Sequence, residues 1–228
     1  MKDLKKKILM KISRIEYKHT NFSAEYKDVE KVYKKLRDNL DKVATGINSL
    51  MTYEHGGSAM KKLYHGLSVV SNASKTNYFS NSDIFEAFAH VNKDLTDSDL
   101  DEGVREVGRK TAEAYGNISK AKFSFNEKCE REMEVLRSMR KRAENIDKER
   151  ENTKIYRYDL EKHRQNDSGE NQEDIDRYSE LFENAQTRSI EMMKDFIGAD
   201  GLQGVLGRIR DYNIEFYNES LKALERSK

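Results

Sequence analysis

The chain has 228 residues, enough for one mid-sized domain or two small ones, and no proline, where average usage near 5% predicts roughly eleven. Charged residues make up 36% of it, hydrophobic residues only 36%, and tryptophan is absent. This composition excludes a thick, many-layered core and favours long helices in a thin bundle. The 42 basic and 41 acidic residues leave a net charge of +1, which gives no whole-protein attraction to nucleic acid or other polyanions.

Residues 1–20 form a separate basic, amphipathic segment. On a helical wheel Met1, Leu4, Ile8, Ile12 and Ile15 fall within about 80° of one another, and basic residues occupy the remaining arc. This pattern is typical of a helix that lies in a membrane interface and inserts its apolar face. The residues expected to do so are Leu4, Lys5, Lys6, Lys7, Ile8, Lys11, Ile12 and Ile15. A flexible basic tail, or the first turns of the first helix, is the alternative.

Apolar residues at alternating steps of four and three predict a long first helix between residues 22 and 50. They are Phe22, Tyr26, Val29, Tyr33, Leu36, Leu40, Val43, Ile47 and Leu50. Such a heptad pattern is typical of coiled coils. Gly56-Gly57 interrupts it, a serine- and asparagine-rich stretch at 71–82 predicts a loop, and residues 84–91 predict a short helix.

A second heptad pattern begins near Asp97 or Ser98, which are plausible N-caps, and meets no turn signal before about residue 165. At 1.5 Å per residue this helix would be roughly 100 Å long. Its apolar positions are Leu100, Val104, Val107, Ala114, Ile118, Ala121, Phe125, Cys129, Met133, Leu136, Met139, Ala143 and Ile146. A polar turn at 165–171 precedes a third helix, in which glycines at 198, 201, 204 and 207 indicate a kink or a close helix contact.

Three long helices with these connections predict an all-α fold, an elongated antiparallel three-helix coiled coil over residues 21–228. One slender bundle has little core. Additional aromatic residues crowd its central segments: Phe85, Phe88, Tyr115, Phe123 and Tyr217. Because a second copy would bury this surface most economically, we expect a two-fold homodimer.

The stretch 156–164, Tyr-Arg-Tyr-Asp-Leu-Glu-Lys-His-Arg, places an aromatic–Asp pair and basic residues just ahead of the predicted tip. Together with the basic start, Glu25-Tyr26, and the stretches 33–36 and 85–88, it makes the chain resemble BAR domains, especially the amphiphysin and Rvs-like N-BAR group. The resemblance covers nearly the whole length. It implies a crescent-shaped dimer with a six-helix central bundle, either a homodimer or a heterodimer with another BAR-domain chain. It also implies that a concave basic face binds anionic, curved membranes and senses or generates curvature, in endocytosis or tubulation.

The charges of the second helix suit such a surface. Between residues 137 and 164 there are ten basic and six acidic side chains, an excess of four. Each Lys or Arg near an anionic leaflet contributes on the order of 1 kcal/mol. The expected membrane contacts are Arg137, Arg140, Lys141, Arg142, Lys148, Lys154, Arg157, Lys162 and Arg164. An ordinary solvated face is the alternative, and residues 167–183, with seven acidic and one basic side chain, depart from the basic tip common in the family.

No motif predicts catalysis, a metal or a cofactor. The five histidines are scattered without metal-ligand spacing, and the glycines match neither a dinucleotide nor a phosphate-binding loop. The single cysteine, Cys129, and an apolar N-terminal run too short for a signal peptide favour a cytoplasmic protein, peripheral on membranes. We therefore expect a membrane-curvature protein without enzymatic activity. The alternative is a cytosolic coiled-coil scaffold or tether that does not bind lipid. Nucleic-acid binding comes a distant third, and an enzyme is the least supported class.

Overall fold

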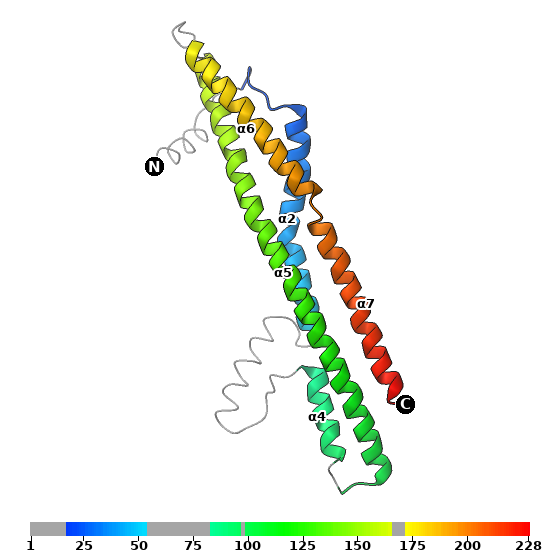
Figure 1. Ribbon diagram of the computed structural model, residues 1–228. Coiled ribbons are helices and arrows are strands. Elements are labelled where there is room, and N and C mark those ends of the chain that lie inside the picture. The colour runs from blue at the N-terminus through cyan, green and yellow to red at the C-terminus, as the bar shows by residue number, and fades with distance from the viewer. Residues whose placement is uncertain (1–16, 54–82, 97–98, 166–171) are drawn as a thin grey trace, which may run out of the picture. The chain divides into compact units, whose positions relative to one another are not determined.

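The computed structural model describes residues 17–53, 83–96, 99–165 and 172–228 (Figure 1). These ranges contain five helices: α2 (Ala24–Thr52), α4 (Ile84–Thr96), α5 (Glu102–Gln165), α6 (Gln172–Gly198) and α7 (Leu202–Arg226). The described residues contain no strand, so the all-α prediction is confirmed. None of the described helices combines the length and the apolar character that a membrane crossing requires.

Short polar side chains start three of these helices. The Ser23 hydroxyl accepts a hydrogen bond from the Tyr26 N–H at the start of α2, and the Asp83 carboxylate accepts one from Glu86 at the start of α4. At the start of α5 the Asp101 carboxylate accepts a hydrogen bond from the Gly103 N–H at 2.7 Å. These bonds satisfy N–H groups that have no partner within the helix. The N-caps predicted for α5, at residues 97 and 98, lie outside the described residues.

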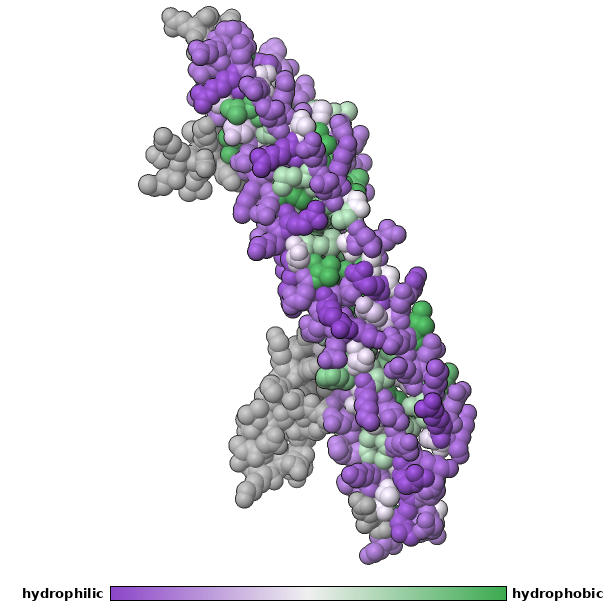
Figure 2. Space-filling model, viewed as in Figure 1, coloured by the Kyte–Doolittle hydropathy of each residue, from purple (hydrophilic) through white to green (hydrophobic). Residues whose placement is uncertain are grey.

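The contacts of the chain divide it into two compact units. Unit 1 comprises Met1–Leu40 and Arg137–Leu202, and unit 2 comprises Asp41–Leu136 and Gln203–Lys228. Of the described helices, α2 and α5 contribute to both units, α6 belongs to unit 1, and α4 and nearly all of α7 belong to unit 2. Figure 2 shows hydrophilic residues over most of the visible face, with hydrophobic residues in small patches between them.

Unit 1 is a three-helix bundle in which α5 runs antiparallel to both α2 and α6. Tyr33 of α2 lies beside Ala143 of α5, whereas the earlier residue Glu30 lies beside the later residue Arg150. Buried aromatic residues from two helices fill the centre: the rings of Tyr33 and Phe196 meet edge to face at 5.4 Å. Within this unit the predicted antiparallel three-helix packing is confirmed.

In unit 2, α7 and α4 both pack against the first half of α5. Phe216 of α7 lies 5.8 Å from Phe125 of α5 and 6.4 Å from Phe85 of α4, measured between ring centroids. Phe88 of α4 meets Tyr115 of α5 edge to face at 4.6 Å. Aromatic contacts therefore join three helices of this unit, around the two buried rings of Phe125 and Phe216.

The predicted third helix is two helices, because the chain leaves the helical path between Gly198 and Leu202. A Cβ atom on Gly201 would lie 2.6 Å from the methyl carbon of Met139, so a larger residue here would displace the flexible end of that side chain of α5. Gly207, in contrast, lies inside α7 with nothing within 4 Å of the same imaginary atom. The glycines were predicted to mark a kink or a close helix contact. Gly201 does both, since it lies at the break between α6 and α7 and close to α5.

Candidate interaction surfaces

The residues just before α2 form an extended segment on the distal part of α5, which we call the strap (residues 17–23). The carboxylate of Glu161 accepts hydrogen bonds from the N–H groups of Lys18, at 2.9 Å, and His19, at 3.3 Å. It also accepts one from the hydroxyl of Thr20, which is buried. Burial alone would raise the pKa of Glu161, but these hydrogen bonds outweigh it and hold the pKa below its usual range.

Arg157 and Arg164, one turn of α5 before and after Glu161, also bind the strap. The guanidinium of Arg157 lies 4.0 Å from the ring centroid of Tyr17 and 4.5 Å from that of Phe22, and its Nε donates to the Thr20 carbonyl at 2.6 Å. Arg164 donates to the His19 carbonyl at 2.9 Å. Burial lowers the pKa of Arg157. Two residues predicted to contact a membrane thus make hydrogen bonds within their own chain.

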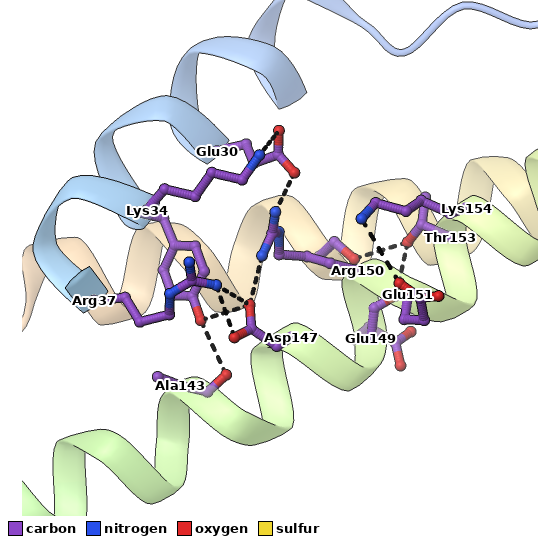
Figure 3. Close-up of polar contacts among 12 residues, drawn as sticks. Glu30, Lys34, Arg37, Ala143, Asp147, Glu149, Arg150, Glu151, Thr153 and Lys154 are labelled. Atoms are coloured by element: carbon purple, nitrogen blue, oxygen red, sulfur yellow. Dashed lines mark hydrogen bonds and ion pairs between the residues drawn. The ribbon is translucent and has the colours of Figure 1, made fainter. Parts of the chain in front are cut away.

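An ionic cluster around the buried side chain of Arg150 links α2 to α5 in unit 1 (Figure 3). Arg150 reaches between the carboxylates of Glu30 and Asp147, with only 5% of its side chain exposed. Asp147 also accepts hydrogen bonds from Arg37, at 2.9 Å, and from the Tyr33 hydroxyl, at 3.1 Å. The sequence places Arg150 in the heptad register of Leu136 and Ala143, and it is buried like them. Its charge is used inside the bundle.

The pKa values in this cluster follow from burial and charge together. Burial would raise the pKa of Glu30, but the hydrogen bonds from Arg150 and Lys34 lower it below the usual range. Burial, and then Asp147, raises the pKa of the Tyr33 hydroxyl. Burial, and then Glu30, raises that of Tyr26 to about 12. At neutral pH the Glu30 carboxylate is therefore ionised and accepts hydrogen bonds, and the Tyr33 hydroxyl keeps the proton that it donates.

Other predicted membrane contacts do lie on the surface. Lys154 is half-buried, 3.7 Å from Glu151. Six of the nine basic residues are exposed: Arg137, Arg140, Lys141, Arg142, Lys148 and Lys162. The predicted inserting residues, Leu4, Lys5, Lys6, Lys7, Ile8, Lys11, Ile12 and Ile15, lie outside the described residues. No geometry here tests membrane contact for either set.

Large hydrophobic side chains are exposed almost entirely on unit 2. Of those exposed among the described residues, all except Val32 belong to this unit. They form two heptad stripes, which we call the apolar face: Ile84, Phe88, Val91 and Leu95 on α4, and Ile214, Tyr217, Leu221 and Leu224 on α7. Phe123, which we expected among the crowded central aromatics, is 65% exposed.

Two buried charged residues of unit 2 were missed by the sequence reasoning. Glu132 accepts two hydrogen bonds from Arg208, both at 2.8 Å, and one from the Tyr212 hydroxyl. These hydrogen bonds, that from Arg208 first, lower the pKa of Glu132. Lys122 is fully buried. One signal in the sequence indicates the burial of Glu132: it lies three residues after Cys129 and four before Leu136, which are both apolar heptad positions. The heptad position between them was assigned to Met133 instead.

Comparison with known proteins identifies the family. Over its full length of 228 residues the chain is 80% identical to spore wall protein 12 of Nosema bombycis, all of which is covered. The chain belongs to the spore wall protein 12 family. It is also 32% identical over 231 residues to spore wall protein 12 of Encephalitozoon cuniculi, with 98% of that protein covered, and 31% identical over 225 residues to that of Enterocytozoon bieneusi, again with 98% covered.

Two further comparisons add little. No protein-family model matches the chain. Among solved structures, it is similar to the crystal structure of a BAR protein from Galdieria sulphuraria, with 16% identity, a TM-score of 0.43, and coverage of 91% of this chain and 95% of that one. The assignment to the amphiphysin and Rvs-like N-BAR group stays a prediction.

The relatives correct the function expected from the sequence. All three carry the name spore wall protein 12, which contradicts the expected role in sensing or generating membrane curvature and the link to endocytosis. The expected cytoplasmic, membrane-peripheral location is contradicted by the same names. The alternative function, a cytosolic scaffold or tether, receives no support from them either. The error came from transferring the function of a family on a helical pattern and one basic motif, both of which serve packing here.

Proposed function

We propose that this protein is a non-enzymatic structural component of a spore wall. The observation that carries the proposal is the 80% identity to spore wall protein 12 of Nosema bombycis, which extends over all of both chains. The two more distant relatives with the same name are also matched over at least 98% of their length, so the shared name covers whole proteins. None of these names mentions a catalytic activity.

A wall component must bind other molecules, and the apolar face supports binding to a second copy. The two stripes of the apolar face carry eight large hydrophobic side chains, each at least 37% exposed. Both stripes of this face have heptad spacing, which is the spacing that helices use to pack against other helices. We therefore propose a two-fold homodimer in which unit 2 of one copy covers unit 2 of the other. A self-complementary patch of this kind is typical of two-fold interfaces.

The location is tested by immunogold electron microscopy of spores, with antibody against the purified chain. We expect gold particles over the wall. Particles confined to the cytoplasm would overturn the proposal, and spores treated with pre-immune serum give the background.

The dimer is tested by sedimentation velocity on the full chain. We expect the mass of two chains, and a monomer for the double variant Tyr217→Glu/Leu221→Glu, whose residues are 61% and 55% exposed in the single chain. Val32→Glu is the matched control, because Val32 is 45% exposed but lies in unit 1. A wild-type monomer, or an equal effect of the control, would contradict this interface. Circular dichroism shows whether each variant keeps its helices.

A further inference from the structure

The exposed charges of unit 1 are segregated between two helices. Along residues 137–165 of α5 the exposed charged side chains are six basic residues and one acidic residue, Glu144. Lys141, Lys148 and Lys162 are separated by multiples of seven, so they lie in one line along the helix. Together with Arg137 we call them the basic stripe. Around Lys141 and Lys148 the stripe lies on the side of α5 opposite the buried position Ala143, whereas Ile155 and Asp159, between Lys148 and Lys162, are buried.

The first half of α6 carries the opposite charge. Along residues 172–184 its exposed charged side chains are four acidic residues and one basic residue, Arg177. The acidic residues follow each other at steps of three and four, which again places them in one line. We call them the acidic stripe: Glu173, Asp176, Glu180 and Glu183. This line lies opposite the buried positions Phe182, Ala185 and Ser189.

The two stripes have opposite charge, yet they face away from the bundle in which α5 and α6 are packed together. A single chain therefore cannot bring them into contact with each other. We propose that the basic stripe of one copy binds the acidic stripe of another copy. This inference rests on the proposed wall function, since it supplies a second self-contact beside the apolar face of unit 2.

The sides of the bundle on which the two stripes lie determine what kind of assembly this contact forms. Because each stripe faces outward from a different helix of the bundle, one neighbour binds the basic stripe and another neighbour binds the acidic stripe. Such a head-to-tail contact joins different surfaces and continues from copy to copy unless the rotation happens to close a ring. Combined with a two-fold contact in unit 2, it links dimers into an extended network, which is the kind of assembly that a wall requires.

The alternative occupant of the basic stripe is an acidic polysaccharide. We favour a second copy because an anionic polymer accounts for the basic stripe alone, whereas a second copy accounts for both stripes. The two alternatives predict different results when the acidic stripe is changed. Binding of a polymer to α5 should not depend on the charge of α6, whereas binding of a second copy should.

The test uses the full-length chain, sedimentation velocity and negative-stain electron microscopy at low and high salt. At about 1 M salt the Debye length falls to about 3 Å, from about 10 Å at 0.1 M, so contacts between exposed charges are screened. We expect species larger than a dimer at low salt, and dimers at high salt. Wild-type protein that stays a dimer at low salt would overturn the inference and leave the apolar dimer standing. A monomer at both salt concentrations would instead contradict the homodimer.

Two triple variants reverse the stripes, and their combination is decisive. Lys141→Glu/Lys148→Glu/Lys162→Glu makes both stripes acidic, and Asp176→Lys/Glu180→Lys/Glu183→Lys makes both basic. We expect each variant alone to assemble about tenfold more weakly beyond the dimer, the effect of three exposed ion pairs. An equimolar mixture of the two should assemble again, and so should one chain that carries all six changes. If the mixture and the sextuple variant both stay dimeric, the stripes do not bind each other.

A matched control separates stripe contact from net charge. Lys27→Glu/Lys31→Glu/Lys35→Glu makes the same charge change on exposed residues of α2 in the same unit. We expect its assembly to match wild type, and an equal loss of assembly would overturn the inference. Retention on a column of sulfated polysaccharide tests the polymer: loss of retention in the basic-stripe variant, with wild-type assembly in both stripe variants, would assign the stripe to a polymer.

Discussion

The ammonium group of Lys122 donates a hydrogen bond to the carbonyl oxygen of Leu50 at 2.8 Å, near the end of α2. Lys122 is fully buried, and its Nζ lies 4.2 Å from the ring centroid of Tyr53 and 5.0 Å from that of Phe125. The last carbonyls of a helix have no partner within it, and a cation is favourable there. Lys122 therefore links the end of α2 to α5 within unit 2.

Replacing this lysine tests that role. Lys122→Met keeps most of the side-chain volume but removes the donor, so we expect the free energy of unfolding to fall by about 1–2 kcal/mol. Urea denaturation followed by circular dichroism measures the change. Lys120→Met is the control, because Lys120 is exposed two residues earlier on the same helix, and its expected effect is within about 0.5 kcal/mol of zero. Equal stability of the two variants would contradict the role of Lys122.

The strap should loosen in acid. The pKa of Glu161 is lowered in the folded chain from the ordinary value of 4.5, so its stabilising contribution is present above pH 4.5 and is lost as the pH falls through the folded-state pKa. We expect Glu161→Gln to lower the free energy of unfolding by about 1–3 kcal/mol at pH 7, and by progressively less below about pH 4. Urea titrations at several pH values measure this.

The control for this pH dependence is Glu144→Gln, on an exposed residue of the same helix. Its stability should match that of the wild type at both neutral and acidic pH. A Glu161→Gln deficit that persisted undiminished at pH 3 would show that the strap does not depend on the ionised carboxylate.

Two glycines should respond in opposite directions to alanine. Gly201→Ala would displace the flexible end of the Met139 side chain, so we expect a loss of at most about 1 kcal/mol in the free energy of unfolding. Gly207→Ala, with open space around it inside α7, should instead gain about 0.5–1 kcal/mol. Thermal and urea denaturation give both values. Adding Met139→Ala to Gly201→Ala should cost less than the sum of the single changes, because they share one contact; strict additivity would contradict the clash.

Cys129 should be almost inert in the folded protein. Burial raises the pKa of its thiol from 9.0 to about 12, and the thiolate is the reactive form. The three-unit difference predicts reaction with Ellman's reagent at pH 8 about a thousandfold slower than in the unfolded chain. Absorbance traces with and without urea measure both rates. A native rate within tenfold of the unfolded rate would show that the thiol is accessible.

The heptad pattern predicted the helices well because burial in a bundle follows period. Tyr26, Tyr33, Leu40 and Ile47, at steps of seven, are all buried. The same pattern was wrong at Leu100, Val104 and Val107, which are at least 45% exposed, because period alone does not say whether another helix covers a face. The break between α6 and α7 was indicated by its glycines but could not be placed without Met139.

The polar contacts were far less predictable than the helices. Arg157 looks like a solvent-facing cation in the sequence, and only the fold brings the rings of Tyr17 and Phe22 next to its guanidinium. Glu161 likewise meets Thr20 across 141 residues of chain. A search for apolar residues at heptad spacing does not detect buried charged residues, because their burial depends on partners that are distant in the sequence.

The pairing of Glu30 with Arg150 also bears on how this chain can vary. A neutral residue at either position removes one of the two ionic partners of the other: Arg150 would keep only Asp147, and Glu30 would keep only Lys34. The remaining side chain is then less well compensated for its burial, at a cost of about 1–3 kcal/mol. Joint replacement by two apolar residues avoids that cost. Single substitutions at these positions should therefore be rare among living lineages, and the two sites should be inherited as a pair, changing together or not at all.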